Sequence, residues 1–150
     1  MIAEPLHQLT RKNQRFCWTD SCQDAFTTLK NKLTEAPILG LPKDEGTFIL
    51  DTDASNCSIG AVLSQIQDGE ERVLSYAGRL YSRAEQNYSV TRKELLSVVF
   101  FLKQFRQYLL GRKFLVRTDH AALQWLRRTP EPIGQQGRWL EVLEEFDFDV

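Results

Sequence analysis

The chain has 150 residues, of which 42% are hydrophobic and 26% charged, and its formal net charge is −1. This length predicts one domain with an appendage, and the composition is sufficient for a packed core. Its apolar runs are shorter than the roughly 18 to 20 residues of a membrane span, so we expect no membrane partner. The first ten residues lack the pattern of a signal peptide.

The cysteines and histidines are few. Three cysteines, Cys17, Cys22 and Cys57, are an odd number. This count favours reduced thiols in an intracellular protein over a disulfide framework. His7 and His120 are the only histidines, which argues against a zinc site because such sites use several nitrogen or sulfur ligands.

Charge is distributed unevenly along the chain. Residues 72–128 contain twelve lysines and arginines and three acids, a net charge of +9, whereas the rest of the chain carries −10. A basic block of this kind can form a surface that contacts a nucleic-acid backbone. It can also consist of solvated side chains on exposed helix faces, and composition does not separate the two interpretations.

Residues 1–40 carry one clear element. Thr19, Asp20 and Ser21 are each suited to cap a helix. Apolar residues follow at near-helical spacing and Pro37 ends the run, which predicts an amphipathic helix of about four turns. A loop containing glycine and proline comes next, and we place a domain boundary there.

Residues 41–150 begin with strands joined by short turns, which predicts an antiparallel meander. A long amphipathic helix, a further strand, two more helices and the start of a last strand follow. We predict strands at about 48–53, 59–66, 72–79, 113–118 and from 147, and helices at about 87–110, 120–126 and 134–146.

Three carboxylates are placed where a catalytic site would need them. Asp53 ends the first strand of this segment and shares one of its faces with Ile49 and Asp51. Asp119 ends another strand, directly before a helix. Glu94 lies in the first turns of the long helix, and the apolar residues that follow it on the same side predict that it points toward the sheet.

Each of these carboxylates also has a structural explanation. Asp53 fits a turn, Asp119 fits a helix N-cap, and Thr91 with Glu94 fits a capping box. A divalent-metal site accounts for all three at once, because Mg²⁺ prefers oxygen ligands and is often held by a few carboxylates. Two such ions about 4 Å apart can activate a water and stabilise the leaving oxygen of a phosphodiester.

Several sequence blocks occur in a characteristic order. They are residues 48–55 with the T-D-A-S stretch, 60–65, 76–80, 88–96 with Y-S-V-T-R-K-E-L-L, and 117–123. In this order they resemble the ribonuclease H domain of gypsy-type long-terminal-repeat retrotransposon polyproteins. Residues 16–37, with the pattern W-T-x-x-x-x-x-A-F-x-x-L-K, resemble the segment that links the polymerase thumb to that domain.

The resemblance implies a mixed α/β, ribonuclease H-like fold. Its sheet has five strands, of which the first three are antiparallel, and helices flank the sheet. It implies that residues 1–40 are the thumb or connection tail of a reverse transcriptase and that 41–150 are the ribonuclease H-like domain. The implied partners are an RNA–DNA hybrid and the rest of the polyprotein, its palm, fingers and thumb. The implied location is intracellular, in a cytoplasmic retroelement particle or in the nucleus.

The implied reaction is Mg²⁺-dependent hydrolysis of the RNA strand of the hybrid at a two-metal site, with Mn²⁺ able to replace Mg²⁺. By the resemblance, Asp53, Glu94 and Asp119 are the catalytic and metal-binding carboxylates. The family has a fourth active-site aspartate beyond the last strand, and this chain stops at Val150, so we expect a truncated C-terminal part, weak Mg²⁺ binding, and poor cleavage or none. The alternative is a catalytically inactive module of the same fold that clamps nucleic acid or is structural.

For nucleic-acid binding, we expect the basic residues of 72–128 to form the hybrid-binding face and the acidic tail at 141–149 to point elsewhere. The first candidates for contact with the backbone are Arg127 and Arg128, next to Trp125. The alternative is that these two arginines are solvated surface.

Overall fold

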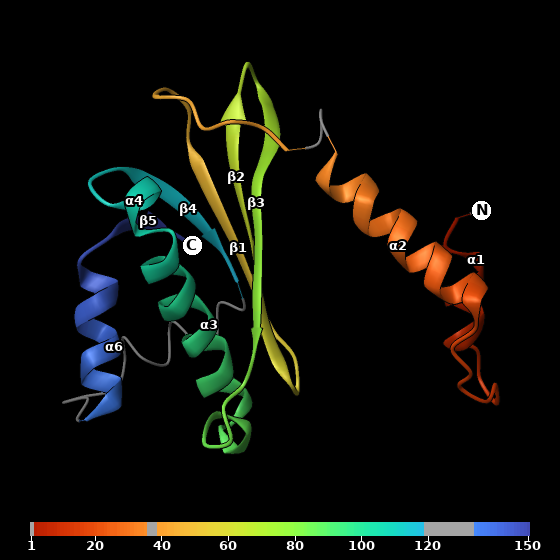
Figure 1. Cartoon of the computed structure of the whole chain (residues 1–150). Coiled ribbons are helices and arrows are strands. Elements are labelled where there is room, and N and C mark those ends of the chain that lie inside the picture. Colours follow the sequence, from red (N-terminus) through yellow and green to blue (C-terminus); the bar gives the residue numbers. More distant parts are fainter. Residues whose placement is uncertain (1, 36–38, 119–133) are drawn as a thin grey trace. The chain divides into compact units, whose positions relative to one another are not determined.

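The structure, a computed structural model, describes residues 2–35, 39–118 and 134–150 (Figure 1). It divides into two compact units, Met1–Gly40 and Leu41–Val150, and each unit is described by itself below. None of the described helices is long and apolar enough to cross a membrane.

The first unit consists of two helices, α1 (Glu4–Leu9) and α2 (Asp20–Thr34). The hydroxyl of Thr19 accepts a hydrogen bond from the backbone N–H of Cys22, so Thr19 is the N-cap of α2. The four-turn helix predicted here is therefore confirmed. The sequence did not predict α1, whose main signal is a proline, Pro5, in its first turn.

The second unit is built on a five-stranded sheet with the strand order β3-β2-β1-β4-β5. β1 pairs antiparallel with β2 and β2 with β3, whereas β4 pairs parallel with both β1 and β5. The predicted mixed sheet, in which the first three strands of the chain are antiparallel, is confirmed. The strands are β1 (Phe48–Ala54), β2 (Ser58–Gln67), β3 (Glu70–Leu80), β4 (Lys113–Arg117) and β5 (Asp147–Asp149).

The helix predicted at 87–110 is divided into three pieces. They are the 3₁₀ turn η1 (Glu85–Asn87), α3 (Val90–Gln104) and α4 (Arg106–Leu109), and α6 (Gln135–Glu144) follows later in the chain. The hydroxyl of Ser89 accepts a hydrogen bond from the backbone N–H of Arg92 at 3.3 Å and caps α3. The capping box considered for Thr91 and Glu94 is therefore wrong, because α3 begins at Val90 and Glu94 lies in its second turn.

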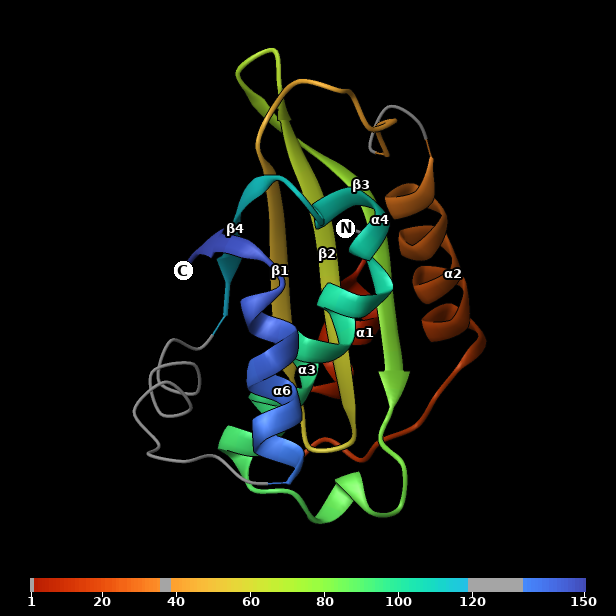
Figure 2. The same cartoon turned by 90° about the vertical axis from the view of Figure 1, so that its left-hand side faces the viewer.

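Helices α3, α4 and α6 all lie on one side of the sheet, as Figure 1 shows edge-on and Figure 2 from the helical side. We call this side the helix face and the other the far face. Because side chains alternate along a strand, Phe48 and Leu50 of β1 point into the helix face, and both are buried. Each large side chain buried here contributes about 1.5–3 kcal/mol. The core also includes Leu63, Leu95, Val98, Phe101, Leu102, Phe114, Val116, Trp139 and Leu143.

Candidate functional site

Asp53 lies on the far face, one residue before the end of β1, and it is exposed. Its partner across the ladder is Gly60, which in turn pairs with Gly78, so the sheet surface beside Asp53 carries no side chains. A shallow groove of about 360 Å³ runs along this part of the far face. Within the described residues the carboxylate of Asp53 makes no hydrogen bond or ion pair, which leaves its oxygens available to a cation.

Asp51 shares the far face with Asp53 but is already paired. Arg117 donates from Nε and Nη2 to the two carboxylate oxygens of Asp51 at 2.6 and 2.7 Å. The same guanidinium also donates to Glu71, at 2.5 and 3.2 Å, and these hydrogen bonds raise the pKa of Arg117. Of the two carboxylates at this end of β1, Asp53 is therefore the one suited to bind an added ligand.

Glu94 is held on α3 with 8% of its surface exposed, so it is buried and does not point into open water. Burial raises the pKa of Tyr81, and the charge of Glu94 raises it further. The hydroxyl of Tyr81 donates to the backbone carbonyl of Ser55 at 3.0 Å. Since Ser55 follows Asp53 by two residues, this hydrogen bond attaches Tyr81 to the turn that β1 enters.

Lys93 makes a second connection between α3 and the same turn. Its Nζ donates to the backbone carbonyl of Asn56 at 3.2 Å and lies 5.0 Å from the centre of the Tyr81 ring. The start of α3 is thus joined to the turn after β1 by one direct hydrogen bond and, through the cation–π contact with Tyr81, by a second one. Sequence reasoning missed Tyr81 and Lys93; only the position of Lys93 beside Glu94 could have suggested one of them.

The exposed Cys57 lies in the same turn. Hydrogen bonds with the hydroxyls of Ser55 and Ser58 lower the pKa of its thiol. The Ser55 and Ser58 hydroxyls are themselves 2.9 Å apart, and Ser55 Oγ lies 3.6 Å from the sulfur of Cys57. The turn is therefore a compact polar structure with its own internal hydrogen bonds.

The structure places two of the three predicted ligands. Asp53 is on the far face and Glu94 is on the helix that covers the opposite face, so the two can meet only around the end of β1. Asp119, the predicted helix at 120–126 and the predicted contacts Arg127 and Arg128 lie outside the described residues. The described ranges contain no group of three His, Cys, Asp or Glu side chains that could hold a metal ion, and the three-carboxylate site stays a prediction.

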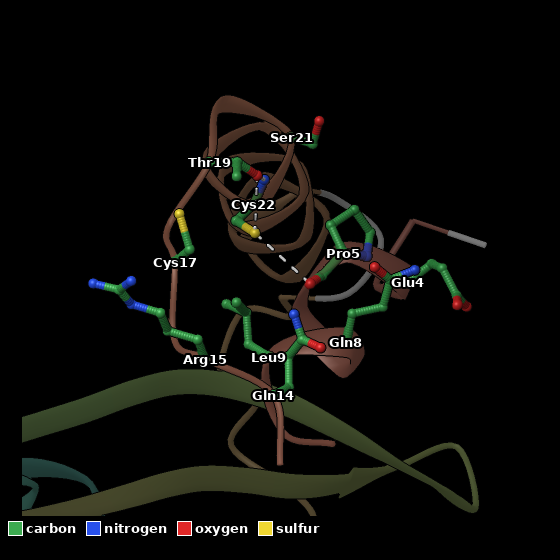
Figure 3. Close-up of a pocket in the computed structure, with 10 residues that line it drawn as sticks. All are labelled: Glu4, Pro5, Gln8, Leu9, Gln14, Arg15, Cys17, Thr19, Ser21 and Cys22. Carbon is green, nitrogen blue, oxygen red and sulfur yellow. Dashed lines mark hydrogen bonds between the residues drawn. The ribbon is translucent and has the colours of Figure 1, made fainter. Parts of the chain in front are cut away.

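The first unit contains a cavity of about 500 Å³ between α1 and α2 (Figure 3). The sulfur of Cys22 faces it, 3.7 Å from the carbonyl oxygen of Pro5. Glu4 and Arg15 line opposite sides of the cavity in Figure 3 and do not converge. This cavity offers no pair of groups arranged for catalysis, so the end of β1 is the candidate site.

Comparison with known proteins agrees with this fold. Residues 18–116 match the family model described as the RNase H-like domain found in reverse transcriptase. The chain is 44% identical, over 99% of its length, to the retrovirus-related Pol polyprotein from transposon 297 of Drosophila melanogaster, and 33% identical, also over 99%, to the transposon Tf2-3 polyprotein of Schizosaccharomyces pombe. It spans 14% and 12% of the length of these two relatives.

Solved structures show the same fold at low sequence identity. The foamy viral protease-reverse transcriptase dRH in complex with double-stranded DNA gives a TM-score of 0.73 at 20% identity, over 99% of this chain and 29% of that chain. The foamy viral protease-reverse transcriptase in complex with an RNA/DNA hybrid gives 0.60 at 21% identity, over 99% and 21%. Since the family model covers more than half of the sequence, the chain belongs to the RNase H-like domains found in reverse transcriptases, and its relatives are retrotransposon polyproteins.

Proposed function

We propose that this chain hydrolyses the RNA strand of RNA–DNA hybrids with Mg²⁺, as part of a retroelement reverse transcriptase polyprotein. The observation that carries the proposal is the presence of two carboxylates, the exposed Asp53 near the end of β1 and the buried Glu94 on α3, where Lys93 of α3 and Tyr81 both bond to the turn that follows β1. Membership of the family supports nuclease chemistry, and the hybrid bound by the foamy viral relative supports the choice of substrate.

The donor set fits the ion. Asp53 and Glu94 supply hard oxygen atoms, which Mg²⁺ prefers, and by the resemblance Asp119 would be the third ligand. When bound, Mg²⁺ activates water and neutralises charge that develops on the phosphodiester. The residues of the chain position these ligands: Tyr81 and Lys93 fix the turn after Asp53, and the bare strand surface at Gly60 and Gly78 admits a backbone close to it.

The wider proposal concerns the parent protein. Residues 1–40 act as the tail of the polymerase thumb or connection, and the polymerase palm, fingers and thumb are the protein partners. The polyprotein acts inside the cell, in a cytoplasmic retroelement particle or in the nucleus. The family match of residues 18–116 and the 44% identity to a Pol polyprotein support this context.

The test compares Asp53→Asn with Asp51→Asn, a matched control on the same strand and face. Mg²⁺ should raise the melting temperature of the unchanged chain, because an ion that binds only the folded state stabilises it. Asp53→Asn should remove this response and any cleavage of the RNA strand in a labelled hybrid, whereas Asp51→Asn should retain both. An equal Mg²⁺ response in Asp53→Asn would overturn the proposed site. Binding of the hybrid without a Mg²⁺ response or cleavage would favour the inactive clamping module.

A further inference from the structure

The basic block at 72–128 is less uniform than its composition suggests. Ten of its twelve lysines and arginines are described, and half of these pair with carboxylates. A paired lysine or arginine has to exchange its carboxylate for a phosphate, whereas an unpaired one keeps its whole charge available. The paired residues are Arg72 with Glu70, Arg79 with Glu85, Arg106 with Glu145, Lys113 with Asp149, and Arg117 with Asp51 and Glu71.

Five basic residues of the block form no ion pair with any described residue: Arg83, Arg92, Lys93, Lys103 and Arg112. Arg92 and Lys93 lie in the first turn of α3, and Arg83 lies between β3 and the 3₁₀ turn η1 that precedes α3. Arg92 and Lys93 directly precede Glu94, and Arg83 follows Tyr81 by two residues. We call Arg83, Arg92 and Lys93 the turn-side patch.

Two members of the turn-side patch are held by neutral groups. The guanidinium of Arg92 lies 4.2 Å from the centre of the Tyr88 ring and donates a hydrogen bond to Gln135, and Gln135 in turn donates to the Tyr88 hydroxyl at 2.8 Å. Lys93 is held by the Asn56 carbonyl and the Tyr81 ring. Rings and amides restrict these side chains without cancelling their charge, so less conformational entropy is lost when a phosphate binds.

The acids nearest to the turn-side patch do not cancel it. Glu85, which lies in the segment between Arg83 and Arg92, is neutralised by a bidentate pair with Arg79 at 2.7 and 2.9 Å. Asp53 and Glu94 are the carboxylates of the candidate metal site, and a bound divalent ion would neutralise them. The patch thus remains positive beside a site suited to a phosphodiester.

We infer that the turn-side patch binds the sugar-phosphate backbone of the hybrid next to the candidate site. This inference rests on the proposed function and names the surface that holds the substrate. The paired arginines of β3 and β4 already contact carboxylates and are therefore less available to a phosphate. Backbone phosphates dominate the affinity of proteins for nucleic acids, and the number of contacts is read from the salt dependence of binding.

The chain offers a matched control in Arg112. Its Nη1 donates to the backbone carbonyl of Asp44 at 2.8 Å, and its guanidinium lies 5.6 Å from the centre of the Phe48 ring. Like Lys93, it is therefore an unpaired cation held by one carbonyl and one ring. Phe48 begins β1, whereas Lys93 contacts the turn after its end, so the two cations are separated by about 20 Å along the strand.

The experiment measures binding of a fluorescent RNA–DNA hybrid to the whole chain at a fixed Mg²⁺ concentration, over a range of salt concentrations, with the RNA strand 2′-O-methylated to prevent cleavage. Arg83→Gln and Lys93→Gln should each reduce the slope of log affinity against log salt by about 1, and Lys93→Arg should restore it. Arg112→Gln and Lys103→Gln should keep the slope of the unchanged chain. Melting temperatures of all variants verify that each is folded.

Two outcomes would overturn the inference, and they differ in what they say of the proposed function. Equal losses in Arg112→Gln and Lys93→Gln would overturn the turn-side patch alone, because hybrid binding would then depend on total charge. Absence of hybrid binding by the unchanged chain would overturn the hybrid as its substrate as well.

Discussion

The two ends of β1 use polar groups in opposite ways. At the amino end, Gln65 lies across from Phe48, is completely buried, and is surrounded by neutral partners. Its amide accepts from the backbone N–H of Lys43 at 2.9 Å and donates to the carbonyls of Lys43 and Glu45 at 2.9 and 3.0 Å. At the carboxyl end the polar groups are instead charged: Asp53, Glu94 and Lys93.

The neutral groups at the amino end of β1 stabilise the fold, whereas the charged groups at its carboxyl end are suited to bind a ligand. A buried amide with all its hydrogen bonds made stabilises one arrangement of the chain and has nothing left to offer a ligand. A buried carboxylate beside an unengaged one is costly to keep, and such groups gather at functional sites. The comparison predicts that changes at the amino end of β1 affect stability alone, whereas changes to Asp53, Glu94 and Lys93 at its carboxyl end also affect ligand binding.

The largest effect is expected for Gln65→Ala. The change leaves the polar groups of Lys43 and Glu45 without their partner and opens a cavity in the sheet, so we expect a loss of about 3–4 kcal/mol in the free energy of unfolding. Urea denaturation measures this loss. The Mg²⁺-dependent rise in melting temperature should persist. A loss below about 1 kcal/mol would show that the amide does not hold the loop at residues 41–46.

Regular patterns explain how much of this architecture the sequence predicts. The alternation in β1 and the helical spacing after Thr19 are local signals, and the strands and α2 followed from them. The break between α3 and α4 at Phe105 was not predicted, because its ring stays buried and the apolar stripe continues through the break. The helix α1 was missed because six residues give no measurable period.

The candidate site was predictable only in part. Sequence alternation places Asp51 and Asp53 on the same face and does not distinguish them. The difference comes from Arg117, 66 residues away from Asp51 in the chain, and from Glu71 on another strand. Likewise, the contacts of Tyr81 and Lys93 join segments that are 26 and 37 residues apart. Such pairings depend on the folded sheet and leave no local pattern.

The next largest effect is expected for Glu85→Gln at the carboxyl end. The Arg79 guanidinium lowers the pKa of Glu85 to about 2, from an ordinary value of 4.5. A carboxyl group whose pKa is lower in the folded state stabilises the protein above pH 4.5 and loses this contribution as the pH falls toward 2. The variant should lose about 1–2 kcal/mol at pH 7, since the pair is only partly exposed.

The measurement for Glu85→Gln is the free energy of unfolding between pH 7 and pH 2. The variant should show a weaker dependence on pH between 5 and 2 than the unchanged chain. Glu70→Gln is the control, because Glu70 pairs with Arg72 on the same strand but is well exposed, so its removal should change little. Identical pH profiles for Glu85→Gln and the unchanged chain would show that the Arg79 pair does not stabilise the fold.

A smaller effect is expected for Tyr81→Phe, which removes one hydroxyl and keeps the ring. Loss of the hydrogen bond to Ser55 should cost about 1 kcal/mol and speed amide hydrogen exchange in the turn at residues 55–58.

A separate variant, Glu94→Gln, removes the negative charge that raises the pKa of Tyr81, so the phenol of Tyr81 should titrate at lower pH. Unchanged titration in Glu94→Gln would show that the charge of Glu94 does not raise the pKa of Tyr81.

The smallest effect is expected for Asp51→Asn, although its ion pair with Arg117 has the best geometry on the far face. The side chains of Arg117 and Asp51 are 46% and 35% exposed, so solvent and salt screen their attraction. Arg117 also keeps Glu71 as a partner, and we therefore expect a loss below about 1 kcal/mol that shrinks at high salt. Urea denaturation at low and high salt measures it. A loss above about 2 kcal/mol, or loss of the Mg²⁺ response, would mean that Asp51 belongs to the functional end of β1 together with Asp53.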